Sequence, residues 1–284
     1  TLPGFESGPS ATSLDDMCQL LRQIVDRISP DQPVTLMLHD WGCVFGYEFA
    51  MRHPETMATL IAPPQPFSVL PYGYAVKPGD DKLGWIMTAA GRDPTIMNGG
   101  VMKNFVSDGT PFASARVGHG GIFVSEVDES DGSIALFRPE VAVLNNISLD
   151  HKSLDELRQL FGDFAKTAKR AIWNADDIET VALLAPMGLN NAISFGFTDR
   201  ADFRATDIIE MPLGSHFTLT VKGESWPVTL QVPGRHNIAN ALAAIAAVAA
   251  LDVPVAQAIH GVERFAGLAR RFDIVGIAGG ITVI

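Results

Sequence analysis

A dense run of prolines and glycines divides the sequence and limits what it can fold into. Five prolines and two glycines lie between residues 62 and 81. Proline removes a backbone donor and glycine weakens regular structure, so neither a helix nor a central strand is expected through most of this run. At 284 residues, the chain is long enough for about two domains. We therefore predict one domain over residues 1–62, a junction over residues 63–81 and a second domain over residues 82–284.

The second domain alternates segments of helical and strand character. Helices are expected at residues 83–90, 154–172 and 238–251, and strands at residues 122–127 and 141–147. This alternation predicts the α/β class, with a mainly parallel sheet flanked by helices. Residues 192–232 instead alternate apolar and polar side chains around short turns, which predicts a small subdomain of antiparallel β-hairpins.

The first domain begins with an amphipathic helix and a strand–turn–helix unit. Apolar residues at helical spacing follow Ser13 and end near Arg27. A short buried strand is expected at residues 34–38 and a helix at residues 43–52, with a turn over residues 39–42 between them.

Composition excludes several classes of function. The net charge of −11 and the absence of a basic cluster argue against a nucleic-acid partner. The longest apolar stretch, residues 241–251, is too short to span a bilayer, which needs about 20 residues. Two cysteines are too few for a disulfide framework, so a cytoplasmic location is expected. The first residues contain neither an initiator Met nor a signal-peptide pattern, and they are typical of a chain that has already been cut.

Asp40 lies in the predicted sharp turn of the first domain, near the start of a helix, where a carboxylate is favoured. The segments at residues 2–7, 38–42 and 45–54 resemble α/β-hydrolases of the epoxide hydrolase and haloalkane dehalogenase type. This resemblance covers about residues 1–62 and implies that Asp40 is a nucleophile that forms an ester with the substrate. The alternative is that Asp40 is a partly exposed turn or cap carboxylate.

Acidic residues and a histidine follow two predicted strands of the second domain. Glu126 opens a segment with four carboxylates, and Asp150 and His151 follow the next strand. Because the carboxyl ends of parallel strands meet at one edge, where open α/β sheets bind ligands, these side chains could meet there. Carboxylate oxygens suit Mg²⁺. A solvated acidic loop and a surface histidine are the alternative interpretation.

Five blocks of the second domain occur in the order typical of Mur ligases. They lie at residues 93–100, 126–132, 146–151, 233–240 and 270–272. Over about residues 74–284 the chain resembles the central domain of this family, whose fold is similar to that of P-loop NTPases. The most similar members join L-alanine to UDP-N-acetylmuramate, using ATP to form an acyl phosphate. The resemblance therefore implies an ATP-dependent amide ligase of peptidoglycan precursor synthesis.

The resemblance also implies roles for individual residues. Glu126 and His151 are expected to be catalytic and to bind Mg²⁺. Residues that would contact ATP are Asn146, His236, Asn237, Arg270 and Arg271. Residues that would lie near the sugar nucleotide are Asn98, Gly99 and Gly100.

One expected element is missing from the sequence. A phosphate-binding loop needs a Gly-Lys pair, and no lysine of this chain follows a glycine. At the place of that loop, Asp80 and Asp81 would repel a triphosphate. We therefore expect an incomplete ligase of doubtful activity, without the flanking domains of its relatives. The alternatives are the hydrolase centred on Asp40 and a non-catalytic composite protein that keeps residual nucleotide binding.

Overall fold

The computed structural model describes residues 14–37, 49, 52–61, 73–76, 82–98, 100–107, 113–127, 133–149, 152–269, 276–278 and 281–283. The chain divides into two compact units, Thr1–Ser68 and Val69–Ile284. Within the described ranges, no helix is both long and apolar enough to span a membrane.

The first unit contains one long helix and a pair of parallel strands. Helix α1 (Leu14–Ile28) and strand β1 (Val34–Met37) confirm the elements expected there. Strand β2 (Met57–Ile61) follows the short 3-10 helix η1 (Pro54–Thr56) and pairs with β1 in parallel. Helix α1 buries Met17, and its Cys18 and Val25 form a small cluster with Phe49. Asp40 lies outside the described residues, so its role as a nucleophile stays a prediction.

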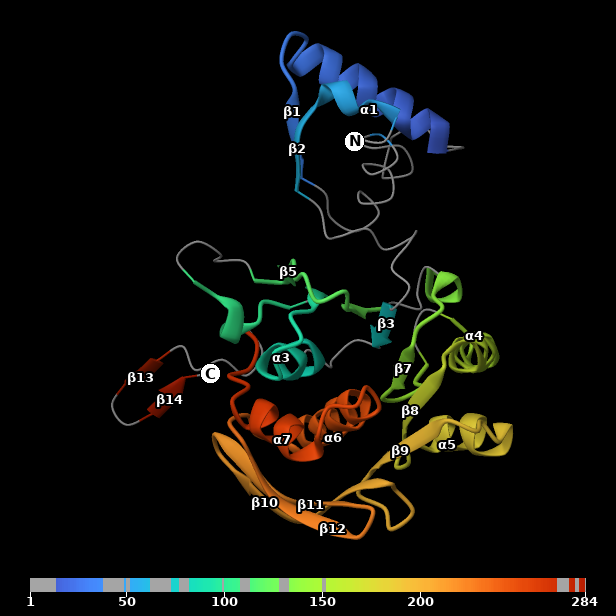
Figure 1. Ribbon diagram of the computed structural model, residues 1–284, viewed down its shortest axis with the longest axis vertical. Coiled ribbons are helices and arrows are strands. Elements are labelled where there is room, and N and C mark those ends of the chain that lie inside the picture. Colours follow the sequence, from blue (N-terminus) through green and yellow to red (C-terminus); the bar gives the residue numbers. More distant parts are fainter. Residues whose placement is uncertain are drawn as a thin grey trace. The chain divides into compact units, whose positions relative to one another are not determined.

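The second unit is built on a ten-stranded sheet (Figure 1). Its strand order is β12-β11-β10-β9-β8-β7-β3-β6-β4-β5. The strands are β3 (Gly73–Val76), β4 (Thr95–Met97), β5 (Ala115–Arg116), β6 (Phe123–Glu126), β7 (Val141–Leu144), β8 (Arg170–Asn174), β9 (Ala192–Gly196), β10 (Phe203–Met211), β11 (Gly214–Val221) and β12 (Glu224–Leu230). A separate hairpin pairs β13 (Gly276–Ala278) with β14 (Ile281–Val283).

The central part of this sheet is parallel, as the sequence predicted. Strand β3 pairs in parallel with β6 and β7, and the parallel pairing continues from β7 through β8 and β9 to the start of β10. Strands β10, β11 and β12 form two antiparallel hairpins, which confirms the predicted antiparallel subdomain in its last three strands. The first strand of the predicted range, β9, belongs to the parallel part instead. Strand β3 lies within the range assigned to the junction.

Helices cover both faces of the sheet (Figure 1). Helices α3 (Lys82–Ala89), α6 (Arg235–Ala249) and α7 (Val255–Glu263) contribute to one core. Helices α4 (Leu154–Thr167) and α5 (Ile178–Leu184) contribute to a second core. Strand β7 alternates between them, since Val141 and Val143 enter the first core while Ala142 and Leu144 enter the second. Short 3-10 segments lie at η2 (Lys103–Phe105), η3 (Ser133–Leu136) and η4 (Ala185–Met187).

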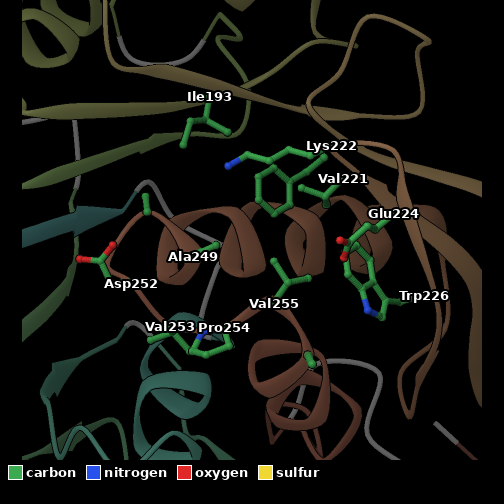
Figure 2. A pocket seen from close by; sticks show the side chains of 13 residues that line it. Ile193, Val221, Lys222, Glu224, Trp226, Ala249, Asp252, Val253, Pro254 and Val255 are labelled. Carbon is green, nitrogen blue, oxygen red and sulfur yellow. The ribbon is translucent and has the colours of Figure 1, made fainter.

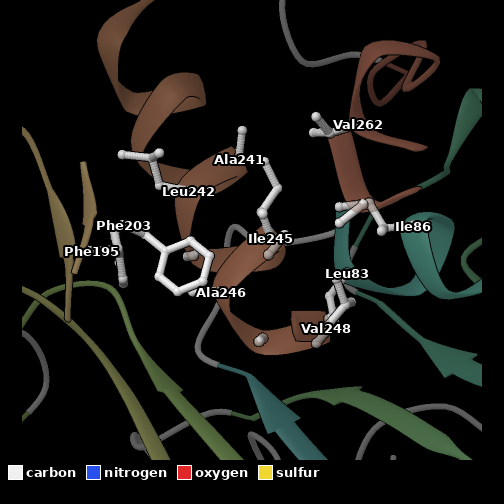
Figure 3. Packing of buried hydrophobic residues seen from close by; sticks show 14 of the residues in the cluster. Leu83, Ile86, Phe195, Phe203, Ala241, Leu242, Ile245, Ala246, Val248 and Val262 are labelled. Atoms are coloured by element: carbon white, nitrogen blue, oxygen red, sulfur yellow. The ribbon is translucent and has the colours of Figure 1, made fainter. Parts of the chain in front are cut away.

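Helix α6 is buried along most of its length. Every residue from Ala241 to Val248 is fully buried. Figure 3 shows this helix between Phe195 and Phe203 of the sheet and Ile86 and Val262 of α3 and α7. Its alanines allow the backbone to approach all of these neighbours closely, and burial on all sides is typical of a uniformly apolar helix.

The predicted helix over residues 154–172 is wrong at its end. Helix α4 ends at Thr167, where the following Ala168 adopts an extended conformation, and residues 170–174 form strand β8. The physical reason is that Ala171 and Ile172 enter opposite cores, which requires the two-residue alternation of a strand between β7 and β9.

Two buried helical glycines give a test of this packing. A Cβ at Gly162 of α4 would lie 3.4 Å from a flexible Leu183 methyl group, whereas a Cβ at Gly261 of α7 would lie 3.2 Å from the backbone Cα of Ile86. We expect Gly162→Ala to raise the free energy of unfolding by up to about 1 kcal/mol through its helix propensity. Gly261→Ala should lower it by about 1–2 kcal/mol, because α3 cannot move away from α7 without disturbing the core. Chemical denaturation measures both, and equal effects of the two substitutions would contradict the predicted close approach of α3 and α7.

Candidate functional site

The carboxyl ends of the central parallel strands meet at one edge of the sheet. Val76, the last residue of β3, is in register with Glu126 of β6 on one side and Val143 of β7 on the other. After β3 the chain continues to β4, which lies beyond β6, whereas β7 lies on the opposite side of β3. Such a reversal of strand order opens a crevice at the carboxyl edge, which is where open α/β sheets bind ligands.

Lys82 is a buried cation at this edge. It is the first residue of α3, which follows β3 in the chain, and it is only 2% exposed. Its Nζ donates a hydrogen bond of 3.1 Å to Asn237 Oδ1 and lies 5.0 Å from the centre of the Phe265 ring. Lysine is rarely this buried, and the positive end of a helix dipole is an unfavourable place for a cation. The same combination of charges favours an anion beside it.

Asn237 belongs to the first turn of α6 and links Lys82 to the loop before that helix. Its Nδ2 donates to the Pro233 carbonyl at 2.8 Å and lies 3.2 Å from His236 Nε2. Gly234 precedes the helix with φ of 96°, and a Cβ there would lie 2.7 Å from the His236 ring. Glycine therefore allows this sharp entry into α6, which aims the first turn at the carboxyl edge.

An exposed cation, Arg235, lies in the first turn of α6. The Arg235 guanidinium stacks 4.7 Å from the centre of the Phe197 ring. Phe197 follows β9, where Asp176 Oδ2 accepts a hydrogen bond from the Phe197 backbone N–H at 2.6 Å and Asp176 Oδ1 accepts one from Thr198 at 3.0 Å. The loops after β8 and β9 are thereby fixed to each other beside α6.

The Phe265 ring is held in place by hydrogen bonds on both sides of its backbone. Asn104 of η2 donates to the Arg264 carbonyl and accepts from the Ala266 N–H, each at 2.8 Å. Trp85 of α3 donates to the Gly261 carbonyl at 2.9 Å, which ties the start of this segment to the helix that carries Lys82. The aromatic face against Lys82 is therefore rigidly placed.

Asparagines from two neighbouring strand ends and from α6 meet at this edge: Asn145 follows β7, Asn174 ends β8 and Asn240 lies on α6. Asn174 Nδ2 donates to the Asn145 carbonyl at 2.9 Å, and Asn145 Nδ2 makes a long contact of 3.5 Å with Asn240 Oδ1 on α6. Asn145 Oδ1 is buried without a hydrogen-bond partner in the described part of the chain. Since a buried carbonyl oxygen without a donor is costly, the edge is suited to a ligand that supplies one.

The predicted metal ligands are only partly described. Glu126 ends β6, is partly buried, and lies beside β3 in the sheet. His151 lies outside the described residues, as do residues 128–132. Among the residues that are described, no group of three or more His, Cys, Asp or Glu side chains could hold a metal ion. The Mg²⁺ site therefore stays a prediction.

The predicted nucleotide residues lie in three places along the chain. Asn237 bonds to Lys82, and His236 contacts Asn237 at the start of α6. Asn146 follows β7, and its Nδ2 donates to Ser148 Oγ at 3.0 Å. Arg270 and Arg271 lie outside the described residues, directly after Ala269, whose N–H donates to the Val101 carbonyl at 2.9 Å.

The predicted sugar-nucleotide residues lie after β4, and Asn98 among them contacts other residues of the protein. Asn98 Nδ2 contacts the Met102 sulfur at 2.6 Å, and its backbone N–H donates to the Ser114 carbonyl. Gly100 packs against Leu268, and Gly99 lies outside the described residues. Their proposed contact with a sugar nucleotide stays a prediction.

Asp93 fixes the loop that leads into β4. It has φ of 50°, and its carboxylate accepts hydrogen bonds from the His119 N–H at 2.8 Å and from Arg116 at 2.6 Å. The backbone N–H of His119, followed by the Arg116 guanidinium, holds the pKa of Asp93 below its usual value. The segments around residues 93 and 119 are therefore joined by a charge-assisted contact.

The middle of the chain is similar to a known family of proteins. Residues 111–248 match the Mur ligase middle domain. The chain is 37% identical over 207 residues to UDP-N-acetylmuramate–L-alanine ligase of Geobacter sp. strain M21, which covers 70% of this chain and 43% of the relative. It is 35% identical over 216 residues to the ligase of the same name from Paracoccus denitrificans, with 70% and 44% covered. The chain thus spans less than half the length of these relatives.

Solved structures of Mur ligases share the fold. UDP-N-acetylmuramate–alanine ligase of Thermotoga maritima superposes with a TM-score of 0.62 at 23% identity, over 73% of this chain and 47% of the other. A murein peptide ligase of Psychrobacter arcticus gives a TM-score of 0.63 at 25% identity, over 83% and 56%. These likenesses support the mixed α/β fold of the second unit. The hydrolase resemblance of residues 1–62 stays a prediction.

Sequence reasoning missed Lys82 as a site residue. The motif requires glycine before the lysine, and here Asp81 precedes it. A weaker signal was available. Lys82 lies directly before the predicted helix at residues 83–90 and shortly after residues 74–76, which belong to strand β3. Its partner Asn237 is 155 residues away in the chain, so their contact could not be inferred from local spacing.

The burial of Lys82 predicts unequal effects of two substitutions. Lys82→Met leaves Asn237 Oδ1 without this donor but also removes the desolvation cost of a buried ammonium, so the stability of the ligand-free protein should stay within about 1 kcal/mol of wild type. Asn237→Leu removes an acceptor from that ammonium and a donor from the Pro233 carbonyl, so the free energy of unfolding should fall by about 1–3 kcal/mol. Thermal and chemical denaturation compare them. A larger loss for Lys82→Met than for Asn237→Leu would refute this assignment.

The lowered pKa of Asp93 predicts a loss of stability in acid. Because the unfolded chain takes up the proton at a higher pH than the folded chain, the contribution of Asp93 is complete above its unfolded pKa and is lost as pH falls through the folded value. Between about pH 5 and about pH 3 the unfolding free energy of wild type should therefore fall more steeply than that of Asp93→Asn. Parallel pH profiles for the two proteins would rule out this contribution.

Proposed function

We propose that the second unit is the ATP-using part of an amide ligase that joins UDP-N-acetylmuramate to L-alanine. The reaction class comes from the relatives of that name, with which the chain shares up to 37% identity. The observation that carries the proposal is the position of Lys82, a buried cation at the start of α3 on the carboxyl edge of the sheet. A phosphate chain bound there would receive both the ammonium and the N–H groups of the helix start.

In the proposed reaction, a carboxylate oxygen of UDP-N-acetylmuramate attacks the terminal phosphorus of ATP, which forms an acyl phosphate and releases ADP. The amino nitrogen of L-alanine then attacks the acyl carbon, and phosphate leaves as the amide forms. Charge on the transferring phosphoryl group has to be neutralised, and positioning supplies most of the catalysis. Lys82 would bind the phosphates from α3, and Arg270 and Arg271 would bind them from the segment after Ala269.

Other residues would orient the nucleotide and its metal ion. His236 and Asn237 at the start of α6 would contact the adenine, and Asn146 would contact ATP from the loop after β7. The donor chemistry of Glu126 and His151, a carboxylate and an imidazole, fits Mg²⁺, which would neutralise phosphate charge when bound. Asn98, Gly99 and Gly100 would contact the sugar nucleotide.

The residues before Lys82 lower the expected affinity. Asp81 stands where a phosphate loop has glycine before its lysine, and the charges of Asp80 and Asp81 oppose a triphosphate. Mg²⁺ would offset part of this repulsion. Binding of ATP should therefore be weak without Mg²⁺ and should depend strongly on Lys82.

Calorimetric titration tests the proposal directly. Wild type should bind Mg-ATP, and Lys82→Met should bind it about ten- to a hundredfold more weakly, because a hydrogen bond to a charged group is lost. Lys166→Met is the matched control, because Lys166 is exposed on α4. The affinity of this variant for Mg-ATP should equal that of wild type.

The same titration with UDP-N-acetylmuramate tests the second substrate. Absence of heat with both ligands would reject the ligase proposal in favour of a non-catalytic composite. Equal weakening by Lys82→Met and Lys166→Met would show that ATP binds elsewhere.

A further inference from the structure

A cavity lies at the opposite end of α6 from Lys82. Its volume is about 550 Å³, which is within the range of small-molecule sites. It forms where the hairpin of β11 and β12 extends past the end of α6 at Ala249 (Figure 2). Three of its 13 lining residues are charged and the rest are apolar. Phe203, Val221 and Val253 form buried parts of its wall.

The strand that borders this cavity carries a carboxylate at the cavity rim. Along β12, Val228 and Leu230 are buried on the face covered by helices, and Trp226 is partly buried on the same face. Because side chains alternate along a strand, Glu224 is directed to this face as well. Glu224 is exposed at the turn end of β12, so its carboxylate lies at the rim of the cavity.

A tight turn places a lysine beside this carboxylate. Lys222 and Gly223 link β11 to β12 with φ of 50° and 83°, and Val221 pairs with Glu224 across the turn. Asp252, with φ of 61°, contributes a second carboxylate from the end of α6. Figure 2 shows Lys222 and Glu224 on the hairpin side of the cavity and Asp252 at its other end. Within the described part of the chain, these three side chains form no hydrogen bond or ion pair.

The charges around the cavity favour a cationic ligand. Two carboxylates face one ammonium, and the negative end of the α6 dipole adds to the carboxylates. The ring of Trp226 borders the cavity next to Glu224, and an aromatic face also attracts cations (Figure 2). The apolar wall, in turn, favours a ligand with a hydrocarbon body.

We propose that this cavity binds a small organic amine with an aromatic or aliphatic body. The body packs against Trp226, Phe203 and Val255, and the ammonium group pairs with Glu224. Lys222 opposes the ligand electrostatically and so limits its affinity. This site is separate from the proposed ATP site, and its occupancy does not depend on the ligase function.

The test uses 2-phenylethylamine as the probe and calorimetry of the whole chain as the measurement. Wild type should bind the amine in preference to 2-phenylethanol and 3-phenylpropionate, which have similar bodies but neutral and negative groups. Glu224→Gln should weaken binding of the amine about two- to fivefold, and Lys222→Gln should strengthen it by a similar factor, as expected for charges at an exposed rim. Both substitutions are at exposed positions, and melting temperatures confirm that the variants are folded.

Several outcomes would overturn the proposal. These are no binding of the amine to folded wild type, tighter binding of 3-phenylpropionate than of the amine, and equal effects of the two substitutions. Trp226→Ala provides an independent measurement. It should weaken binding of both the amine and the alcohol, whereas Glu224→Gln should weaken binding of the amine only. Lys82→Met should leave amine binding unchanged, so that a failure of the ATP proposal is distinguishable from a failure of this one.

Discussion

The burial of α6 from Ala241 to Val248 is the constraint on which the second unit depends. Its alanine-rich surface contacts the sheet on one side and α3 and α7 on the other. Close packing of this kind allows little adjustment, since even one added methylene group is felt in a dense core. The helix therefore fixes the distance between the sheet and the outer helices. The positions of Lys82, Asn237 and Phe265 relative to each other follow from that spacing.

The buried ammonium of Lys82 shows how a fold can retain a costly group. A cation at a helix start, removed from water, is destabilising unless other groups compensate. Asn237 and Phe265 supply part of that compensation through a carboxamide oxygen and an aromatic face. Neither partner carries a full negative charge, so an anion would interact with Lys82 more favourably than they do.

Local patterns predicted the type of most elements but not the contacts between them. The alternation of strands and helices gave the parallel sheet, and apolar alternation gave the hairpins of β10 to β12. The end of α4 was missed because Ala165, Ala168, Ala171 and Ile172 continue an apolar pattern that fits a helix, and only pairing with β7 and β9 makes residues 170–174 a strand. Lys82 was missed because its neighbour Asp81 breaks the expected motif. Its role rests on Asn237 and Phe265, which adjoin it only in the folded chain.

Helix α6 also connects two sites that differ in chemistry. Its 15 residues span about 22 Å from the turn at Gly234 to the cavity beside Ala249. A helix with alanine on most faces has few side chains that could change rotamer when a neighbour moves, so the helix is expected to move as one rigid unit. Enlarging any of its inner alanines would shift both of its ends together. The sequence of α6 is thus constrained by the site at each of its ends. Substitutions that an ordinary amphipathic helix tolerates would disturb both sites here.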